Sequence, residues 1–456
     1  MSNENWLIYP TVDLFVYDLA DGIRQNEDKI SKNREQFWQK IYGDQISASQ
    51  LEKLKQAETE TADYIELLGD QKIAKFDNLD GYAYPVKFGD TYAVQFDLSA
   101  NIEPDEVHEF APKEIECLKS LTQEVISRVN PPATIGQSLL VWGQLFPDQD
   151  ALATAKNCYT KLNLFQNAKW ETDLKANGKF LGANFYELWQ PPGDRSNISQ
   201  NHHVLICLFS YNSGESFDVN KKNITKLYTH LMRLFACRNK VICAYTQSRQ
   251  VKARLKDSSG EIKQLVNQLI GRVNAPKVDL KELQKKLVNF LTISSCYAEH
   301  IIELELQENI IKTNLENYDR KLETIGKDMG TDAEAFKFMA KFSIFAKDKY
   351  VWQVKSDNRS FSADLRLLEN AIQTIEGIIE IERAKSDRTL NVTIGTVGMG
   401  IGISGVVAST YSSQIKSPAS PINPMDVNAV FWSSIGLGIL PALIAIVLIA
   451  IGNRRR

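Results

Sequence analysis

The chain has 456 residues, and its 53 lysine and arginine residues nearly balance its 56 aspartate and glutamate residues. A formal net charge of −3 at pH 7 excludes the strongly basic surface typical of nucleic-acid-binding proteins, so we expect no nucleic-acid partner. The length is sufficient for two or three domains.

Residues 1–248 alternate between strand-like and helix-like stretches, which predicts a cytoplasmic mixed α/β domain. Ala83 to Leu98 alternates apolar and polar residues around Gly89-Asp90, the pattern of a β-hairpin. A helix is expected from Pro104 to Val129. The other expected strands are Trp6–Tyr17, Ser138–Leu145, Phe180–Leu188, His203–Phe209 and Val241–Thr246, with helices at Gln149–Leu162 and Lys221–Ala236.

This domain lacks the common catalytic and nucleotide-binding motifs. It has no Walker loop, no GxGxxG after a strand, no HExxH and no GxSxG, so we expect neither enzymatic activity nor a cofactor. His202 and His203 lead into a strand and point to opposite faces, which argues against a shared metal ion. The loop from Pro191 to Gln200 is interpreted as a solvated loop, and anion binding at Gly193-Asp194-Arg195-Ser196-Asn197 is the alternative.

Two further groups of residues are of the types that bind metal ions. His300 lies at helical spacing from Glu299 and Glu303, but a solvated or packed helix face is the preferred interpretation. The cysteines form no CxxC pair and are expected to be reduced and mostly buried rather than disulfide-bonded or zinc-bound. They are Cys117, Cys158, Cys207, Cys237, Cys243 and Cys296.

Residues 249–388 are predicted to form a stalk of three long antiparallel helices. The first is expected to be capped by Asp279 and to end near Asp328. Its apolar residues follow a coiled-coil-like spacing. They are Leu280, Leu283, Leu287, Phe290, Ser294 and Tyr297, where Ser294 is the polar member.

The second and third helices of the stalk are separated by a predicted break. The second runs from Thr331 to about Lys355, is rich in aromatic residues, and is expected to end at Ser356-Asp357-Asn358. The third begins at Ser360, and its apolar residues recur at spacings of 3 and 4, which predicts one apolar stripe. The stripe comprises Phe361, Leu365, Leu368, Ile372, Ile375 and Ile379.

Residues 389–456 contain two uncharged runs, Leu390–Tyr411 and Val427–Asn453, joined by a proline-rich loop. Each exceeds the roughly 18 apolar residues that mark a membrane-span candidate. The sequence therefore predicts a C-terminal hairpin of two transmembrane helices.

Basic residues flank the hairpin at both ends. Arg383, Lys385 and Arg388 precede the first span and Arg454–Arg456 follow the second, whereas the loop carries only Lys416. The positive-inside rule therefore predicts a multi-pass protein of the inner or plasma membrane with both termini in the cytoplasm. The first ten residues have neither a basic nor an apolar signal-peptide region, so no signal peptide is expected.

One face of the first span consists of small and polar residues. Close helix packing is one interpretation, since Gly398 and Gly402 form a small-xxx-small pair. The other is a face that lines a water-filled pore on the axis of an oligomer. The face comprises Asn391, Gly395, Gly398, Gly402, Gly405, Ser409 and Ser412.

The helical phase relates this face to the apolar stripe below the membrane. At about 100° per residue, Ile379 and Gly395 point roughly 160° apart on a straight helix. If the glycine face lines an axis, the apolar stripe therefore faces away from it. The predicted polar face comprises Arg366, Asn370, Gln373 and Gly377, with Glu380 close by.

A long cytoplasmic helix, two spans with a short external loop and a basic tail resemble the CorA family of pentameric divalent-cation channels. That family carries a Tyr-Gly-Met-Asn-aromatic signature where the first span ends, and this chain reads Tyr411-Ser412-Ser413-Gln414-Ile415 there. Met425-Asp426 resembles, in altered form, the family's Met-Pro-Glu in the loop. The resemblance implies a homopentamer that passes Mg²⁺ or another divalent cation through a filter at Ser412, Ser413 and Gln414. A ring of Asp426 carboxylates would attract cations to it.

Three functions are compatible with the sequence. The first is a CorA-like channel or transporter for cations, gated by its cytoplasmic domain. The second is a ligand-gated membrane effector in signalling or defence, whose α/β domain senses a small molecule. The third is a membrane-tethered coiled-coil scaffold without a pore.

Overall fold

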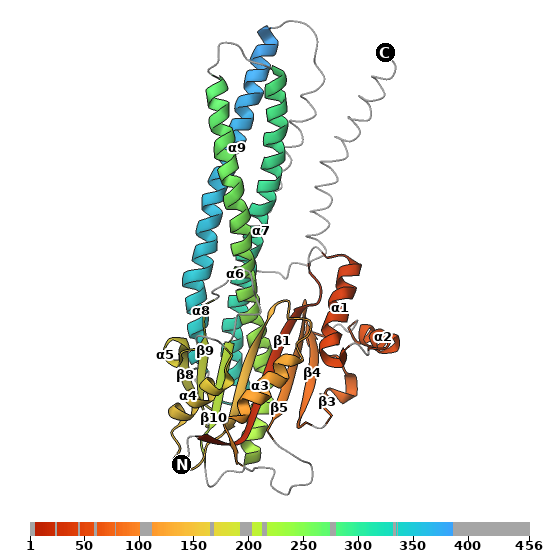
Figure 1. The fold of residues 1–456 in the computed structure, drawn as a ribbon, viewed down its shortest axis with the longest axis vertical. Coiled ribbons are helices and arrows are strands. Elements are labelled where there is room, and N and C mark those ends of the chain that lie inside the picture. Colours follow the sequence, from red (N-terminus) through yellow and green to blue (C-terminus); the bar gives the residue numbers. More distant parts are fainter. Residues whose placement is uncertain are drawn as a thin grey trace. The chain divides into compact units, whose positions relative to one another are not determined.

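The computed structural model is described here for the residues whose placement is defined. They are residues 5–22, 25–43, 46–58, 62–77, 79–100, 112–164, 168–191, 203–211, 217–273, 280–331, 334 and 336–385. The chain divides into two compact units, residues 1–374 and 375–456. An N-terminal mixed α/β domain is followed by long helices (Figure 1), as the sequence predicts.

The described strands form one ten-stranded sheet in the order β2-β4-β5-β1-β7-β10-β9-β8, with β3 beside β4 and β6 beside β1. Strand β10 runs parallel to β7, and the remaining described pairs are antiparallel. The strands are β1 (Trp6–Leu19), β2 (Ile65–Glu66), β3 (Ala74–Lys75), β4 (Gly81–Phe88), β5 (Thr91–Ser99), β6 (Pro112–Glu114), β7 (Gly136–Gln144), β8 (Leu174–Phe180), β9 (Ala183–Trp189) and β10 (His203–Phe209).

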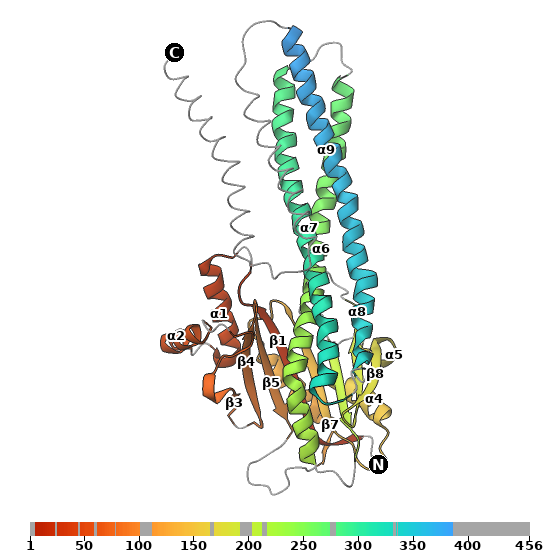
Figure 2. The ribbon, with the colours of Figure 1, turned by 180° about the vertical axis from the view of Figure 1, so that it is seen from behind.

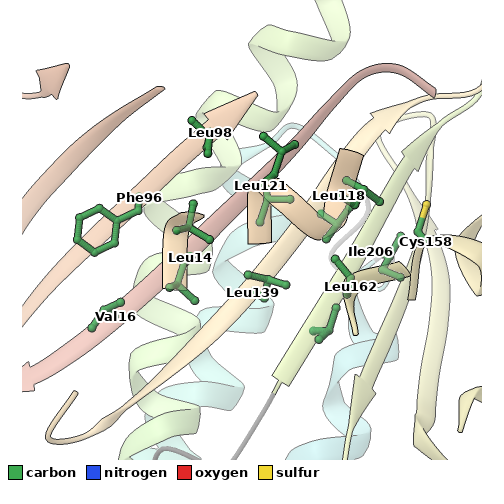
Figure 3. Packing of buried hydrophobic residues seen from close by; sticks show 14 of the residues in the cluster. Leu14, Val16, Phe96, Leu98, Leu118, Leu121, Leu139, Cys158, Leu162 and Ile206 are labelled. Carbon is green, nitrogen blue, oxygen red and sulfur yellow. The ribbon is translucent and has the colours of Figure 1, made fainter. Parts of the chain in front are cut away.

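One face of this sheet is apolar and forms the main core (Figure 3). Leu14 and Val16 of β1 pack there with Leu139 of β7 and Ile206 of β10. The helices that cover this face are α1 (Glu27–Tyr42), α3 (Cys117–Ser127) and α4 (Ala151–Leu162). Two short helices, α2 (Ala48–Ala57) and α5 (Trp170–Asp173), and the single turn η3 (Gly69–Gln71) complete the domain.

Three long helical segments follow the sheet (Figure 2). Helix α6 (Phe217–Val273) has 57 residues and α7 (Leu280–Asp328) has 49. A shorter series, η5 (Lys337–Met339), α8 (Ala340–Ala346) and the π-helical η6 (Lys347–Val351), leads into α9 (Trp352–Lys385). Tyr245 of α6 stacks on Tyr350 of η6 with ring centroids 4.1 Å apart, so the third segment packs on the first.

Several expected elements are confirmed. The hairpin of β4 and β5 turns at Gly89, whose φ of +54° is accessible to glycine at little cost. Strand β10 has the predicted bounds, and α7 begins one residue after the predicted Asp279, which lies outside the described residues. The coiled-coil-like positions Leu283, Leu287, Phe290 and Tyr297 of α7 are buried.

The predicted strand Val241–Thr246 is wrong, because these residues lie within α6. Val241, Ile242, Cys243 and Ala244 are consecutive and all buried. A helix covered on several sides is apolar around its circumference, and a short apolar run then cannot be told from a strand by periodicity.

The predicted break at Ser356-Asp357-Asn358 is also wrong, since α9 continues through it. Asp357 is buried and its carboxylate faces Arg249 and Lys252 of α6. The polar residues therefore pair across helices instead of ending one. The predicted helix Thr331–Lys355 is instead divided among η5, α8, η6 and the start of α9.

The predicted helix Pro104–Val129 is shorter than expected. Strand β6 occupies Pro112–Glu114, and α3 begins at Cys117. Pro112 and the preference of X-Pro pairs for extended backbone account for a strand in place of helix before Cys117, and residues 104–111 lie outside the described residues.

The two predicted faces of α9 are confirmed. The apolar stripe is buried at Phe361, Leu368, Ile372, Ile375 and Ile379, and Leu365 is half-buried. The opposite polar face is exposed at Arg366, Asn370, Gln373 and Glu380, and Gly377 is half-buried.

Candidate functional site

The second face of the sheet differs from the apolar face because it carries buried polar residues. Helix α6 covers this face, and we call the layer between them the sheet–α6 joint. Its sheet residues come from neighbouring strands β5, β1, β7, β10 and β9. They are Thr11, Asp13, Gln95, Asp97, Ser99, Ser138, Gln144, Glu187 and His203, all buried.

A pair of carboxyl groups lies at the centre of the joint. Asp13 of β1 and Asp97 of β5 are cross-strand partners and hydrogen-bond to each other. Gln95 Nε2 donates to Asp13 Oδ1 at 2.7 Å, and Asp13 Oδ2 has no other hydrogen-bond partner within the described part of the chain. Burial first, and then the neighbouring Asp97 charge, raise the pKa of Asp13 well above its usual range.

The pKa of Asp97 is also raised, to about 6, chiefly by burial. Its hydrogen bonds from Asp13 and Tyr228 oppose that shift. We therefore place a proton on Asp13, donated to the Asp97 carboxylate, because two adjacent buried carboxylates cannot both ionise cheaply.

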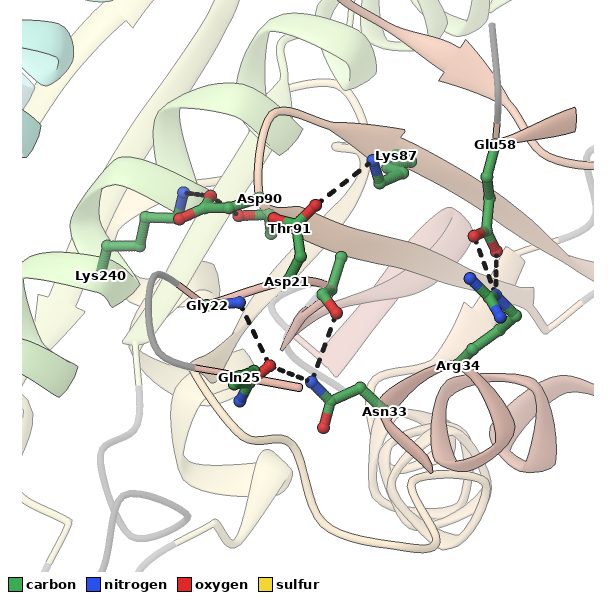
Figure 4. Close-up of polar contacts among 11 residues, drawn as sticks. Asp21, Gly22, Gln25, Asn33, Arg34, Glu58, Lys87, Asp90, Thr91 and Lys240 are labelled. Atoms are coloured by element: carbon green, nitrogen blue, oxygen red, sulfur yellow. Dashed lines mark hydrogen bonds and ion pairs between the residues drawn. The ribbon is translucent and has the colours of Figure 1, made fainter. Parts of the chain in front are cut away.

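The carboxyl pair is connected directly to α6. Tyr228 Oη donates to Asp97 Oδ2 at 3.1 Å and accepts a hydrogen bond from Trp142 Nε1 at 2.9 Å. Tyr17 Oη donates to the backbone oxygen of Met232 at 2.9 Å. At the hairpin turn, Lys240 of α6 pairs with Asp90 (Figure 4). The polar groups of the sheet therefore fix the position of α6.

A second polar cluster lies farther along the sheet. Asn239 Nδ2 of α6 donates to Ser138 Oγ at 2.9 Å, and Ser138 Oγ lies 3.0 Å from His203 Nδ1. Because Ser138 already accepts from Asn239, its hydroxyl can donate to Nδ1, which places the ring proton on Nε2. His203 Nε2 lies 3.3 Å from Glu187 Oε1, outside hydrogen-bond geometry.

Ser138, His203 and Glu187 resemble a nucleophile, base and acid in composition only. Their exposed fractions are 1%, 1% and 0%, so no substrate reaches Ser138 Oγ in this conformation. Burial, and then Arg238, lower the pKa of His203 well below its usual range, so the ring stays neutral. The arrangement is therefore a buried hydrogen-bonded cluster and not an open catalytic site.

Arg238 of α6 links this cluster to the following helices. Its guanidinium lies 5.6 Å from the Trp189 ring of β9 and 4.6 Å from the Phe342 ring of α8. Its charge interacts with Glu187, whose pKa burial raises to about 7 despite that cation. A single buried cation therefore contacts the sheet on one side and the third helical segment on the other.

Several polar atoms around Arg238 lack hydrogen-bond partners among the residues that are described. They are Glu187 Oε1 and Oε2, His203 Nε2, Trp189 Nε1, Arg238 Nε and Tyr350 Oη. An unpartnered buried polar group costs about 1–3 kcal/mol. These atoms lie where α6 packs on the sheet, which makes this the least satisfied polar region of the joint among the described residues.

The metal-site candidates find no support in the described residues. Glu303 accepts a hydrogen bond from Arg254 at 2.8 Å, and no group of three or more potential His, Cys, Asp or Glu ligands is present in the described ranges. His202 and residues 192–200 lie outside those ranges. All six cysteines are free; Cys158, Cys207 and Cys243 are buried, whereas Cys296 is exposed.

The residues predicted to line a pore or to form its ion filter lie outside the described part of the chain. Both uncharged runs lie outside it as well. The predicted pore and filter residues are Asn391, Gly395, Gly398, Gly402, Gly405, Ser409, Tyr411, Ser412, Ser413, Gln414 and Asp426. Within residues 5–385, as far as they are described, no helix is long and apolar enough to cross a bilayer.

No protein-family profile matches this chain, and no curated protein matches it either.

Sequence reasoning missed the charged residues of the joint. Asp13, Asp97 and Glu187 each stand between two large apolar residues in mid-strand. Alternation alone assigns such a position to the solvent face of the sheet. The available signal is that three strands carry acids, together with other polar residues, on the same face of the sheet, and that α6 holds Arg238 and Tyr228 opposite them.

Proposed function

We propose that this chain is a subunit of a CorA-like oligomeric membrane channel or transporter for divalent cations. Its α/β domain controls a pore formed by the first uncharged run. The observation that carries the proposal is α6, a single 57-residue helix that begins on the polar face of the sheet and continues into the helical bundle.

Helix α6 provides a mechanical connection between the joint and the bundle. Tyr228 and Asn239 contact the sheet, whereas Arg249 and Ser259 contact Asp357 and Asp364 of α9. At 1.5 Å per residue the helix is about 85 Å long, so a small tilt on the sheet becomes a larger displacement at its far end. Interfaces of this kind switch between discrete packings rather than deform gradually.

Helix α9 would connect α6 and the sheet to the proposed pore. Helix α9 ends at Lys385, shortly before the uncharged run that begins at Leu390. If one straight helix continued into that run, as the sequence predicts, the exposed polar face of α9 would share the phase of the glycine-rich face, as expected of a funnel above a pore. A sheet domain followed by long helices, the last leading toward the membrane, agrees with the layout of the CorA family.

In this proposal the ions pass a filter without the Gly-Met turn of the CorA family. Hydrated Mg²⁺ is held through oxygen ligands because its dehydration is costly. Rings of Ser412, Ser413 and Gln414 offer neutral oxygens, and a ring of Asp426 adds charge without choosing among cations. We therefore expect weakly selective cation passage.

Ion flux from vesicles that contain the full chain tests the function. Asp426→Asn should reduce flux of Mg²⁺ and other cations, and Gln414→Ala should change the preference among ions. Ser420→Ala, an uncharged change in the same loop, is the matched control and should leave flux unchanged. Strong Mg²⁺ selectivity that survives both substitutions would place the filter elsewhere.

Assembly is tested separately by native mass spectrometry in mild detergent. A pentamer is expected from the resemblance and from the small-residue face of the first run. Only monomers or dimers at micromolar concentration would contradict the proposed ring.

The unpartnered polar atoms around Arg238 favour a second candidate, a ligand-gated effector in signalling or defence on the same scaffold. Cation flux that requires a small-molecule fraction from the cytosol would select this candidate. Assembly without flux under either condition would select a scaffold without a pore.

A further inference from the structure

The carboxyl pair Asp13–Asp97 has a position that no requirement of the sheet explains. Both side chains are buried in the central strands, where an apolar pair would fill the same space without the desolvation of two acids. Their only link to the helices is Tyr228 of α6, among the described hydrogen bonds of the pair. The polar pair therefore joins the sheet to α6 as well as β1 to β5.

The surroundings of the pair contain few groups that could compensate a second negative charge. Strand β4 contributes Tyr82, whose hydroxyl is held neutral by burial and by the two acids. Strand β10 contributes the buried thiol of Cys207. The remaining titratable groups that face the pair are Tyr228 and Lys221 of α6, Tyr9 of β1 and Asp80.

Lys221 is a cation at the α6 side of this cluster. Its ammonium lies 4.8 Å from the centre of the Tyr9 ring and 3.4 Å from Tyr9 Oη. It is half-buried, so it offsets one carboxylate while Asp80 adds another negative charge nearby. Asp80 therefore already offsets Lys221, and a second ionised acid in the pair would add further uncompensated negative charge.

We propose that Asp13 and Asp97 form a proton-dependent latch between the sheet and α6. With one proton between them, Asp13 donates to Asp97, and Asp97 accepts from Tyr228 and holds the helix. When that proton leaves, two adjacent carboxylates repel each other, and relief requires that water enter the joint and α6 loosen. The latch itself does not depend on the proposed function. Only the transmission of its opening through α6 to the pore rests on that function.

The direction of the pH dependence follows from the raised pKa values of both acids. The closed joint binds the shared proton more tightly than an opened joint, where water reaches each carboxylate and the pKa falls toward about 4. Above about 6, the pKa of Asp97, the closed pair holds one proton and an opened joint holds none, so raising the pH further toward the higher pKa of Asp13 weakens the latch. Each pH unit in this window favours opening by up to about tenfold.

Hydrogen exchange of the full chain in detergent micelles tests the latch. The readout is the protection of the α6 amides from Ile224 to Asn239 between pH 6 and pH 8, corrected for the intrinsic exchange rate. In the wild type we expect the equilibrium constant for opening of the joint to rise by about tenfold or more between pH 6 and pH 8. Asp13→Asn, whose amide donates to Asp97 at every pH, should make it independent of pH.

Two variants keep the test decisive. Asp97→Asn removes the same repulsion and replaces Asp13→Asn if that variant does not fold. Asp357→Asn, a buried acid of α9 that faces two cations, is the matched control and should retain the wild-type pH dependence at Ile224–Asn239.

The outcomes separate the latch from the channel. A wild-type chain that passes ions while its α6 protection is independent of pH overturns the latch and leaves the proposed function intact. Equal pH dependence in the wild type and in Asp13→Asn also overturns it. The expected pH dependence in a chain that passes no ions supports the latch and refutes the channel.

Discussion

Asp357 gives the clearest test of how the helical bundle is held together. Its carboxylate lies 2.6 Å from Arg249 Nη1 and 2.8 Å from Lys252 Nζ, both on α6, and it accepts a hydrogen bond from Gln353. Only 3% of the Arg249 side chain is exposed, against 32% for Lys252. Replacing Asp357 with alanine therefore leaves the Arg249 cation buried without its counter-charge.

The expected loss is large because the penalty is that of an unpaired buried charge. Breaking such a pair typically costs about 3–5 kcal/mol. Lys252 is partly exposed, so water compensates part of its lost interaction with Asp357. We therefore expect Asp357→Ala to reduce the free energy of unfolding by about 3 kcal/mol. The matched control is Glu303→Ala, which breaks an α6–α7 pair whose Arg254 side chain is 50% exposed. It should cost below about 1 kcal/mol.

Denaturant unfolding of the full chain in detergent, followed by helical circular dichroism, measures both losses. The double variant Arg249→Met with Asp357→Leu should recover most of the stability, since the buried charges leave together. A loss for Asp357→Ala no larger than that for Glu303→Ala would refute the reasoning, because Asp357 would then not bind α9 to α6.

Three further substitutions replace glycines and test close packing elsewhere in the chain. Gly136→Ala should destabilise the chain by about 1–3 kcal/mol in the same assay, because φ is +148° and the new Cβ would lie 2.6 Å from Asn239 Oδ1; stability equal to wild type would contradict it. Gly178→Ala, whose Cβ would overlap the Phe338 ring, should loosen η5 from β8 and raise the proteolysis rate there, and an unchanged cleavage pattern would refute this. Gly398→Leu should disrupt the oligomer seen by native mass spectrometry while Ile401→Leu does not, and equal effects would remove any special role for the glycine face.

The elements of the sheet that follow local rules could be predicted from the sequence. Gly89-Asp90 defines a hairpin through turn chemistry alone, and strand β10 is an apolar run bounded by polar residues. The apolar seam of α7 could be predicted equally well, because a helix with one covered side shows a clear 3.6-residue period.

The elements that depend on tertiary contacts could not be predicted in this way. Val241–Thr246 has the composition of a strand but lies in a helix with partners on several sides. Ser356-Asp357-Asn358 has the composition of a helix end, yet α6 supplies the cations that keep Asp357 inside the bundle. In both cases contacts between segments that are distant in the sequence decide the outcome.

The candidate site could not be predicted from the sequence for the same reason. A mid-strand acid such as Asp13 or Glu187 ordinarily marks the solvated face of a sheet. Here α6 covers that face and places Tyr228 and Arg238 opposite the acids. Only the pairing of strand and helix reveals that these residues are buried, and their chemistry depends entirely on that burial.

Glu187 and Arg238 allow the coupling across the joint to be measured directly. Removal of the cation by Arg238→Met leaves a buried carboxyl without its counter-charge, and Glu187→Gln leaves a buried guanidinium without its own. Each variant should lower the free energy of unfolding, but the double variant should lower it by less than the sum, by about 1–3 kcal/mol, because neither charge is then left alone.

The pH dependence of the same variants supplies an independent check. The pKa of Glu187 is raised to about 7, so the folded chain retains a proton that the unfolded chain has already lost. Stability due to this group should therefore fall as the pH rises from about 4 to about 7, and Glu187→Gln should abolish that part of the slope. Unfolding free energies measured at pH 5 and pH 8 test both statements. Additive losses, together with an unchanged slope in Glu187→Gln, would show that Glu187 and Arg238 do not act as a pair. The sheet would then have no charged connection to the helices through Arg238.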